Sequence, residues 1–294
     1  MLIEKFIEYL QIEKNYSVNT LSAYKKDLTE FQVFIKENYD KYVIENVDYK
    51  TVRSWIVLLV NKNLSNRSIN RKVSSLKSFY KFLVKTDTIS SSPLIAHSPL
   101  KQSKKIQVPF SKEEIGALLD SNFFKNDYRG VLHKTIISFF YFTGVRRIEL
   151  INLKASDINM NSSTIRIMGK RNKERIIPML PRLNESINEY IKIKSQEFNK
   201  KISEYLFVSK SGTQLSEKYV YRTVNEYFKL VSPKVKKAPH VLRHSFATHL
   251  INEGADINSV KELLGHSSLS STQVYSHTSM ERIKEVFKDT HPRA

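Results

Sequence analysis

Apolar residues recur at intervals of three and four along residues 1–86, the spacing that gives an amphipathic helix one buried face. Polar segments separate four such stripes, and Asp48 and Ser65 are suited to cap the third and fourth helices. The stripes are Leu2, Ile3, Phe6, Ile7 and Leu10; Leu21, Tyr24, Leu28, Phe31 and Ile35; Val52, Ile56 and Leu59; and Ile69, Val73, Leu76, Tyr80 and Leu83. The pattern predicts an amino-terminal four-helix domain, 1–86.

The helical pattern then stops. Residues 87–109 are rich in serine, proline and lysine, which predicts a linker between two domains. A helix start at Ser111–Glu114 and a buried helix around Leu132–Phe140 open the second domain, 110–294. Two short strands at 164–168 and 175–178 flank the basic turn 169–174, and more helices are predicted near 183–198, 216–231, 240–252, 256–264 and 279–289. The fold class is therefore mostly α with a small β-hairpin.

Charge suggests the class of partner. The 294 residues hold 48 Lys and Arg against 29 Asp and Glu, a net charge of +19 with a pI near 9.8. A surplus this large favours a polyanion, either nucleic acid or an anionic membrane surface. The absence of cysteine excludes disulfides, thiol nucleophiles and Cys-ligated metals. With no apolar run of about 18 residues and no secretory signal at the start, we expect a soluble, cytoplasmic protein.

The polar face of the fourth predicted helix combines long cations with short polar side chains, a mixture that contacts phosphates in DNA-binding proteins. These residues are Arg67, Asn70, Arg71, Ser74, Ser78 and Lys81. Basic stripes are also common on solvated helices, and the spacing alone favours that second interpretation.

Four segments of the second domain carry residues that could perform chemistry: Thr143–Leu150, Gly169–Arg175, His240–His244, and Leu263–His266 followed by Tyr275. A phosphate-binding P-loop is unlikely because Gly169-Lys170 is not followed by Ser or Thr. Metal binding at His240 and His244 is disfavoured by the intervening Arg243. A two-metal nuclease needs clustered carboxylates, whereas those of this domain are scattered.

The segments instead favour a phosphate site built from fixed cations. Arginine forms a planar, permanently charged fork for phosphate oxygens. A lysine on a hairpin turn can give up a proton, and histidines can exchange protons near neutral pH. Cations around a phosphate can stabilise a phenolate, so a tyrosine could act as nucleophile on a DNA phosphodiester without metal or ATP.

These segments resemble the tyrosine recombinases of the phage integrase family, and most closely the bacterial Xer-type recombinases. The resemblance rests on the order of His240-Val-Leu-Arg-His244, Leu-Leu-Gly-His266 and Tyr275, nine residues further on, and on the ending His291-Pro-Arg-Ala294. It covers almost the whole chain. It implies a SAM-like core-binding amino-terminal domain, a mixed α+β catalytic domain and site-specific recombination of DNA.

By motif, the resemblance makes Arg146 and Arg243 the clamps on the scissile phosphate. Lys170 becomes the acid that protonates the leaving 5′-oxygen, with Lys173 as the alternative, and Tyr275 becomes the nucleophile that forms a 3′-phosphotyrosyl intermediate. His240 forms the second catalytic box together with Arg243, and His266 assists the phosphoryl oxygen or the nucleophile. Arg171, Lys173, Lys236 and Lys237 are candidate DNA contacts, and Arg171 stands where the family usually has glycine.

The resemblance also implies partners: double-stranded DNA, a homotetramer or a heterotetramer with a related recombinase working through a Holliday junction, and a DNA translocase as activator. No metal or cofactor is expected. The final helix near 279–289 would dock on a neighbouring protomer, and the protein would act on the nucleoid. Two alternatives stay open: a mobile-element integrase with the same chemistry, and a non-catalytic architectural DNA-binding protein.

Overall fold

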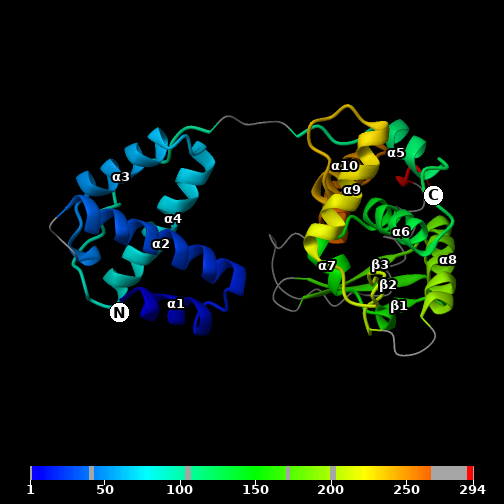
Figure 1. The fold of residues 1–294 in the computed structure, drawn as a ribbon, viewed down its shortest axis with the longest axis horizontal. Helices are drawn as coiled ribbons and strands as arrows, with labels where there is room; N and C mark the ends of the chain where they lie inside the picture. Colours follow the sequence, from blue (N-terminus) through cyan, green and yellow to red (C-terminus); the bar gives the residue numbers. More distant parts are fainter. Residues whose placement is uncertain are drawn as a thin grey trace. The chain divides into compact units, whose positions relative to one another are not determined.

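The computed structural model describes residues 2–39, 43–102, 107–169, 173–198, 203–265 and 290–293. The chain divides into two compact units, Met1–Lys105 and Ile106–Ala294, each with its own hydrophobic core (Figure 1). None of the described helices is long and apolar enough to cross a membrane.

The first unit is a helical bundle made of α1 (Leu2–Ile12), α2 (Val18–Asn38), the short 3-10 helix η1 (Ile44–Asn46), α3 (Tyr49–Asn61) and α4 (Asn66–Lys85). The four predicted helices are confirmed, and their stripes face one core around Phe31, Trp55 and Tyr80. Both expected caps are present: Asp48 accepts from the Thr51 amide at 2.8 Å, and Ser65 accepts from the Ser68 amide at 3.2 Å.

A buried carboxylate ties α2 to α4. Asp27, whose side chain is 1% exposed, accepts two hydrogen bonds from Arg71 at 2.5 and 3.0 Å, one from Lys72 at 3.1 Å and one from the Ser75 hydroxyl at 2.8 Å. Lys72 also pairs with Glu30. These bonds replace the water that the carboxylate loses on folding, so they hold the two helices in register.

Replacing Asp27 with alanine is expected to destabilise the first unit by about 3–5 kcal/mol, because it takes the shared carboxylate from the buried Lys72, from Ser75 and from Arg71. The matched control Glu30→Gln removes the more exposed partner of the same lysine, and about 1 kcal/mol or less is expected. Urea unfolding followed by fluorescence measures both, since Trp55 is the only tryptophan and packs against Phe31 in this unit. Equal midpoints for Asp27→Ala and wild type would contradict the prediction.

Much of the segment 87–109, predicted to be a linker, packs on the first unit. Leu94 is completely buried in that core, and Ile89 and Leu100 pack against it. The Asn70 side chain holds Leu100 through both of its backbone groups, at 2.8 and 2.9 Å, and Asn66 donates to the Lys101 carbonyl at 2.8 Å. Three apolar residues spaced irregularly give no helical or strand period, which is why the sequence pattern did not indicate this packing.

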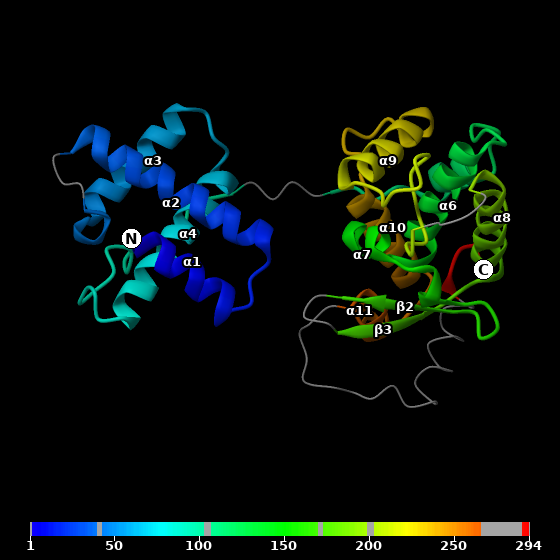
Figure 2. The same ribbon diagram turned by 60° about the horizontal axis from the view of Figure 1, so that its bottom comes forward.

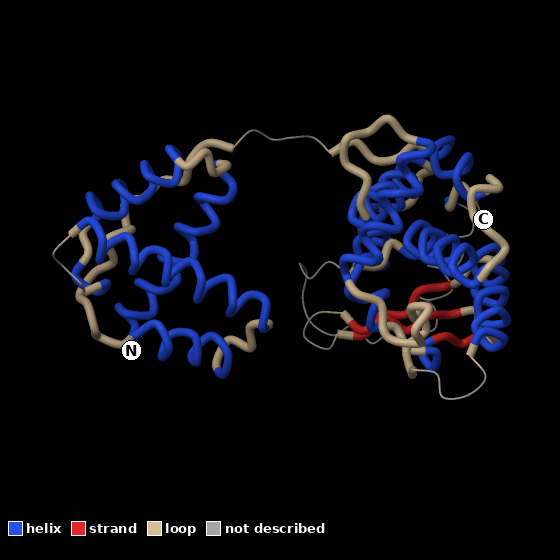
Figure 3. The backbone as a smooth tube through the Cα atoms, in the orientation of Figure 1, coloured by secondary structure: helices blue, strands red, loops and turns tan. Residues whose placement is uncertain are grey.

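The second unit places helices beside one small sheet, and all described strands lie in this unit (Figure 3). Its helices are α5 (Lys112–Leu119), α6 (Tyr128–Thr143), α7 (Arg147–Asn152), α8 (Pro181–Glu197), α9 (Glu217–Val231), α10 (Pro239–Asn252) and α11 (Ile257–Leu264), with the 3-10 helix η2 (Ala155–Asp157). Helix α6 is buried on nearly every side because α8, α9 and α10 pack around it.

The sheet is antiparallel in the order β1 (Ile158–Asn159), β2 (Thr164–Met168) and β3 (Glu174–Pro178). Ile165 pairs with Ile177 and Met168 with Glu174, so the predicted hairpin is confirmed. The two-residue strand β1 and the six-residue helix α7 are too short to show a period and were not predicted. Helix α11 packs against β3 (Figure 2). The helix expected near 279–289 lies outside the described residues.

Candidate active site

The segment Thr143–Leu150 forms a sharp corner between α6 and α7. Gly144 ends α6 with φ +59°, and a Cβ there would lie 2.4 Å from the Phe246 ring, so a glycine is required on both grounds. Two residues later Arg146 precedes α7, where its backbone amide donates to Glu149 Oε2 at 2.8 Å and its Nη1 donates to Glu149 Oε1 at 2.7 Å. Glu149 therefore fixes both the backbone amide and the guanidinium of Arg146.

Three arginines from three different elements converge on the carboxyl end of α11. Arg175 donates to the Leu263 carbonyl at 2.9 Å, Arg243 to the Leu264 carbonyl at 2.6 Å, and Arg146 to the Gly265 carbonyl at 3.1 Å. These carbonyls have no partner inside the helix, and the helix dipole makes this end negative. Gly265 closes α11 with φ +62°. The Leu-Leu-Gly box thus serves as the common anchor of the arginines.

Arg243 reaches this point from α10, which Pro239 begins. Its Nη1 donates to the Gly144 carbonyl at 2.5 Å, so the guanidinium bridges the end of α6 and the end of α11. Burial, together with the charge of Arg146, lowers the pKa of Arg243 to about 10, which still leaves it charged at neutral pH. An arginine has five N–H donors, so among the described residues these two carbonyl bonds leave three donors of Arg243 without a protein partner.

His240 lies three residues before Arg243, on the same side of α10, and its ring is exposed. Partial desolvation and the charges of Lys236 and Arg147 lower the pKa of His240. The neutral imidazole is therefore favoured at neutral pH, and this form can accept a proton.

A buried ion pair between Glu149 and Arg175 supports the cluster, and no sequence motif indicated it. Glu149 accepts from Arg175 Nη1 at 3.1 Å and from Arg175 Nη2 at 2.7 Å, in addition to its bonds with Arg146. Burial alone would raise the pKa of Glu149, but the hydrogen bonds from Arg175 and Arg146 outweigh it and hold the pKa below its usual range. The cluster thus combines three cations, Arg146, Arg175 and Arg243, with one carboxylate, Glu149. Its surplus positive charge suits an anionic ligand.

The structure separates the two neighbouring arginines of the corner. Arg147 pairs with Glu217 at the start of α9, whereas Arg146 turns to α11. Position 146 is therefore the one that joins Arg243. Lys173 is exposed next to β3, Lys236 is exposed before α10, and Lys237 donates to the Lys234 carbonyl. Lys170, Arg171, His266 and Tyr275 lie outside the described residues.

On α4, the residues proposed to contact DNA fall into two groups. Arg67 and Lys81 are exposed. Arg71 is engaged with Asp27, Asn70 with Leu100, and the Ser74 hydroxyl donates to the Asn70 carbonyl at 2.8 Å. The second group is thus held by contacts inside the first unit.

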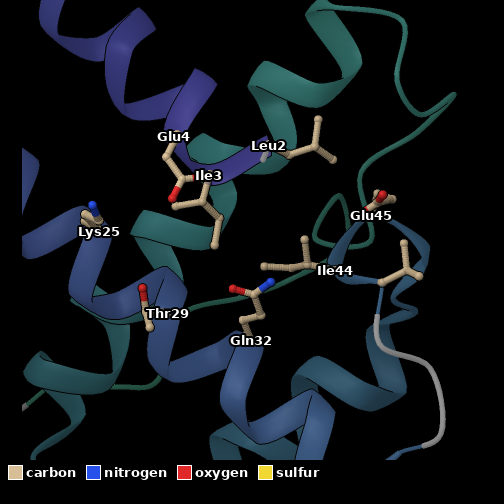
Figure 4. A pocket seen from close by; sticks show the side chains of 9 residues that line it. Leu2, Ile3, Glu4, Lys25, Thr29, Gln32, Ile44 and Glu45 are labelled. Atoms are coloured by element: carbon tan, nitrogen blue, oxygen red, sulfur yellow. The ribbon is translucent and has the colours of Figure 1, made fainter.

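Two pockets in the described residues lie elsewhere. One lies in the first unit beside α1, α2 and η1 (Figure 4), and its charged residues are Glu4, Glu45 and Lys25. That balance of two carboxylates to one ammonium is unsuited to a polyanion. The other is lined by residues that include Asp120, Arg182 and Arg293. The described residues contain no group of three or more His, Asp or Glu side chains arranged to hold a metal ion.

Comparison with known proteins identifies the family. The profile of the phage integrase family matches residues 110–282, and that of the phage integrase N-terminal SAM-like domain matches residues 3–87. Tyrosine recombinase XerC of Anoxybacillus flavithermus is 39% identical over 292 residues, 98% of this chain and 97% of that protein. Tyrosine recombinase XerD of Staphylococcus haemolyticus is 34% identical over 295 residues, 100% of this chain and 99% of that protein.

Solved structures with a similar fold agree with these family matches. The XerH site-specific recombinase, in a post-cleavage complex with a palindromic difH substrate, has a TM-score of 0.73 at 24% identity, with 96% of this chain and 82% of that chain covered. Two family profiles together span both units, and the curated relatives match from end to end. The chain therefore belongs to the phage integrase family of tyrosine recombinases, which are DNA strand-transferring enzymes.

Proposed function

We propose that this protein is an Xer-type site-specific recombinase that cuts and rejoins DNA through a 3′-phosphotyrosyl intermediate and a Holliday junction, and that it resolves chromosome dimers. The observation that carries the proposal is the placement of Arg146 and Arg243 at one helix end, each with N–H donors that bind none of the described residues. The Leu264 and Gly265 carbonyls that hold them stand directly before His266, nine residues before Tyr275.

In this mechanism Arg146 and Arg243 bind the two non-bridging oxygens of the scissile phosphate. The phenol oxygen of Tyr275 forms a bond to phosphorus while its proton passes to a neutral histidine, His240 or His266. The bond from phosphorus to the 5′-oxygen breaks, and that oxygen takes a proton from Lys170 or Lys173. The arginines stabilise the charge that builds up on the phosphorane-like transition state. Because one phosphoester replaces another, the step is readily reversible and rejoining needs no ATP.

The proposed partners are double-stranded DNA and three further recombinase protomers, either copies of this chain or a related recombinase, with a DNA translocase as activator. The protein would work in the cytoplasm on the nucleoid. Relatives named XerC and XerD both match from end to end, so the proposal includes both a homotetramer and a heterotetramer with a related recombinase. A mobile-element integrase with the same chemistry is the second candidate, favoured by likeness in fold to the Tn1549 transposon integrase, with a TM-score of 0.71 at 21% identity. Sequencing DNA trapped on the protein distinguishes the two roles.

The decisive experiment uses wild-type protein and nicked suicide substrates, which trap the covalent intermediate because the cut strand cannot be rejoined. We expect an adduct in EDTA without ATP, with the nucleotide on the proteolytic peptide that contains Tyr275. A strict requirement for a divalent metal, or an adduct on a peptide other than that of Tyr275, would contradict the proposal.

A further inference from the structure

Arg175 lies on strand β3 with its side chain turned into the protein. Its side chain is 5% exposed, whereas its neighbours Glu174 and Ile176 are exposed. An isoleucine thus faces solvent while an arginine takes the buried position. Burying a guanidinium is unfavourable unless it is paired and hydrogen-bonded, so this inversion of the hydrophobic pattern needs a specific partner at that position.

The partners of Arg175 belong to two other parts of the candidate site. Its Nη1 and Nη2 hold both oxygens of Glu149 at 3.1 and 2.7 Å, and its Nε donates to the Leu263 carbonyl at 2.9 Å. Glu149 in turn holds the Arg146 guanidinium at 2.7 Å. Arg175 therefore joins β3 to the Arg146 corner and to the end of α11.

The space around the guanidinium is shaped to fit it. A Cβ on Gly265 would lie 3.2 Å from Arg175 Nη1, and a Cβ on Gly169 would lie 3.7 Å from the same atom. A planar fork can span one carboxylate and one carbonyl at once, whereas a lysine ammonium is a single point of charge. The three contacts therefore require arginine rather than any cation.

We propose that Arg175 is a positioning residue for DNA cleavage, which rests on the proposed function. Acting through Glu149, it fixes the direction of the Arg146 guanidinium. Through the Leu263 carbonyl it fixes the start of the segment that carries His266 and Tyr275. It does not touch the DNA itself, because its guanidinium is buried among protein groups.

The test compares Arg175→Met and Arg175→Lys with Arg166→Met. Arg166 lies on the neighbouring strand β2 and pairs with Asp157 at 3.0 Å, but its side chain is 52% exposed and none of its described contacts is with the arginine cluster. Single-turnover cleavage of the suicide substrate is measured at saturating DNA, beside DNA affinity by fluorescence anisotropy and the thermal midpoint. We expect both Arg175 variants to cleave roughly 30–300-fold more slowly, the scale of a misplaced catalytic group. DNA affinity should stay within about threefold, and Arg166→Met should cleave at about the wild-type rate.

A double-substitution experiment separates positioning from general loss of structure. In a Glu149→Gln background, Arg175→Lys should reduce the rate by a smaller factor than it does in the wild-type background, because the route through Glu149 to Arg146 is already lost and only the bond to the Leu263 carbonyl remains to be disturbed. The proposal would be overturned if the rate losses of the two single variants multiplied in the double variant. It would also be overturned if the Arg175→Lys variant cleaved at the wild-type rate. If the Arg175→Met variant does not fold, the Arg175→Lys variant alone tests the proposal by the same criteria. Failure of wild-type protein to form an adduct would instead contradict the proposed function.

Discussion

The Tyr275→Phe variant is expected to bind DNA as wild type does and to form no covalent adduct. The substitution removes a single oxygen atom and leaves the aromatic ring, so only the nucleophile is lost. Since the intermediate is an ester of that oxygen, no partial activity is expected, and the rate should fall below detection on suicide substrates. Fluorescence anisotropy measures DNA binding, and gel separation under denaturing conditions measures the covalent adduct.

The matched control is Tyr221→Phe, which removes the same atom from a tyrosine on α9 that is 42% exposed. It should form the adduct at the wild-type rate. The chain has 15 tyrosines, so this comparison shows that the loss belongs to position 275 and not to phenols in general. A covalent adduct formed by the Tyr275→Phe variant would show that Tyr275 is not the nucleophile.

Helices that bury one face were predictable from the sequence, because their apolar residues recur at a local spacing. The stripe on α4 from Ile69 to Leu83 is buried as expected. The opposite face of α4 was harder to interpret. Arg71 has the composition of a phosphate contact, yet it pairs with Asp27, 44 residues earlier in the chain. A local period carries no information about such a distant partner, so the sequence could not distinguish a DNA contact from an internal ion pair.

The candidate site shows the same limit. The motifs indicated Arg146 and Arg243 individually, and their order along the chain indicated the family. They did not indicate Arg175, because Ile176 is the more hydrophobic neighbour and strand alternation alone would place it inside. The signal that could have found Arg175 is chemical: Glu149 is the one carboxylate in the segment of Arg146, it can pair with a second cation, and Arg175 directly follows the predicted basic turn 169–174. Only coordinates show that these residues meet at the end of α11.

The Arg243→Ala variant is expected to lose roughly 1,000-fold or more of its cleavage rate at saturating DNA, the scale reported for arginines that stabilise phosphoryl-transfer transition states. Two effects act together. The phosphate loses a bidentate cation, and the Gly144 and Leu264 carbonyls lose the donor that links α6 to α11. Arg243→Lys should recover little, because an ammonium cannot reach both carbonyls and the phosphate from one position.

Arg147→Ala provides the control, since it removes an equal charge from the adjoining corner. Arg147 directs its guanidinium to Glu217, away from the α11 carbonyls, so its removal should change the saturated rate by less than about fivefold. Arg146→Ala, one residue earlier, should instead behave like Arg243→Ala. This contrast between neighbouring arginines tests geometry, because net charge is identical in the two variants. If Arg147→Ala were the slower of the two, the clamp would belong to position 147. A rate for Arg243→Ala within tenfold of wild type would mean that the cluster at the end of α11 stabilises the fold and not the transition state.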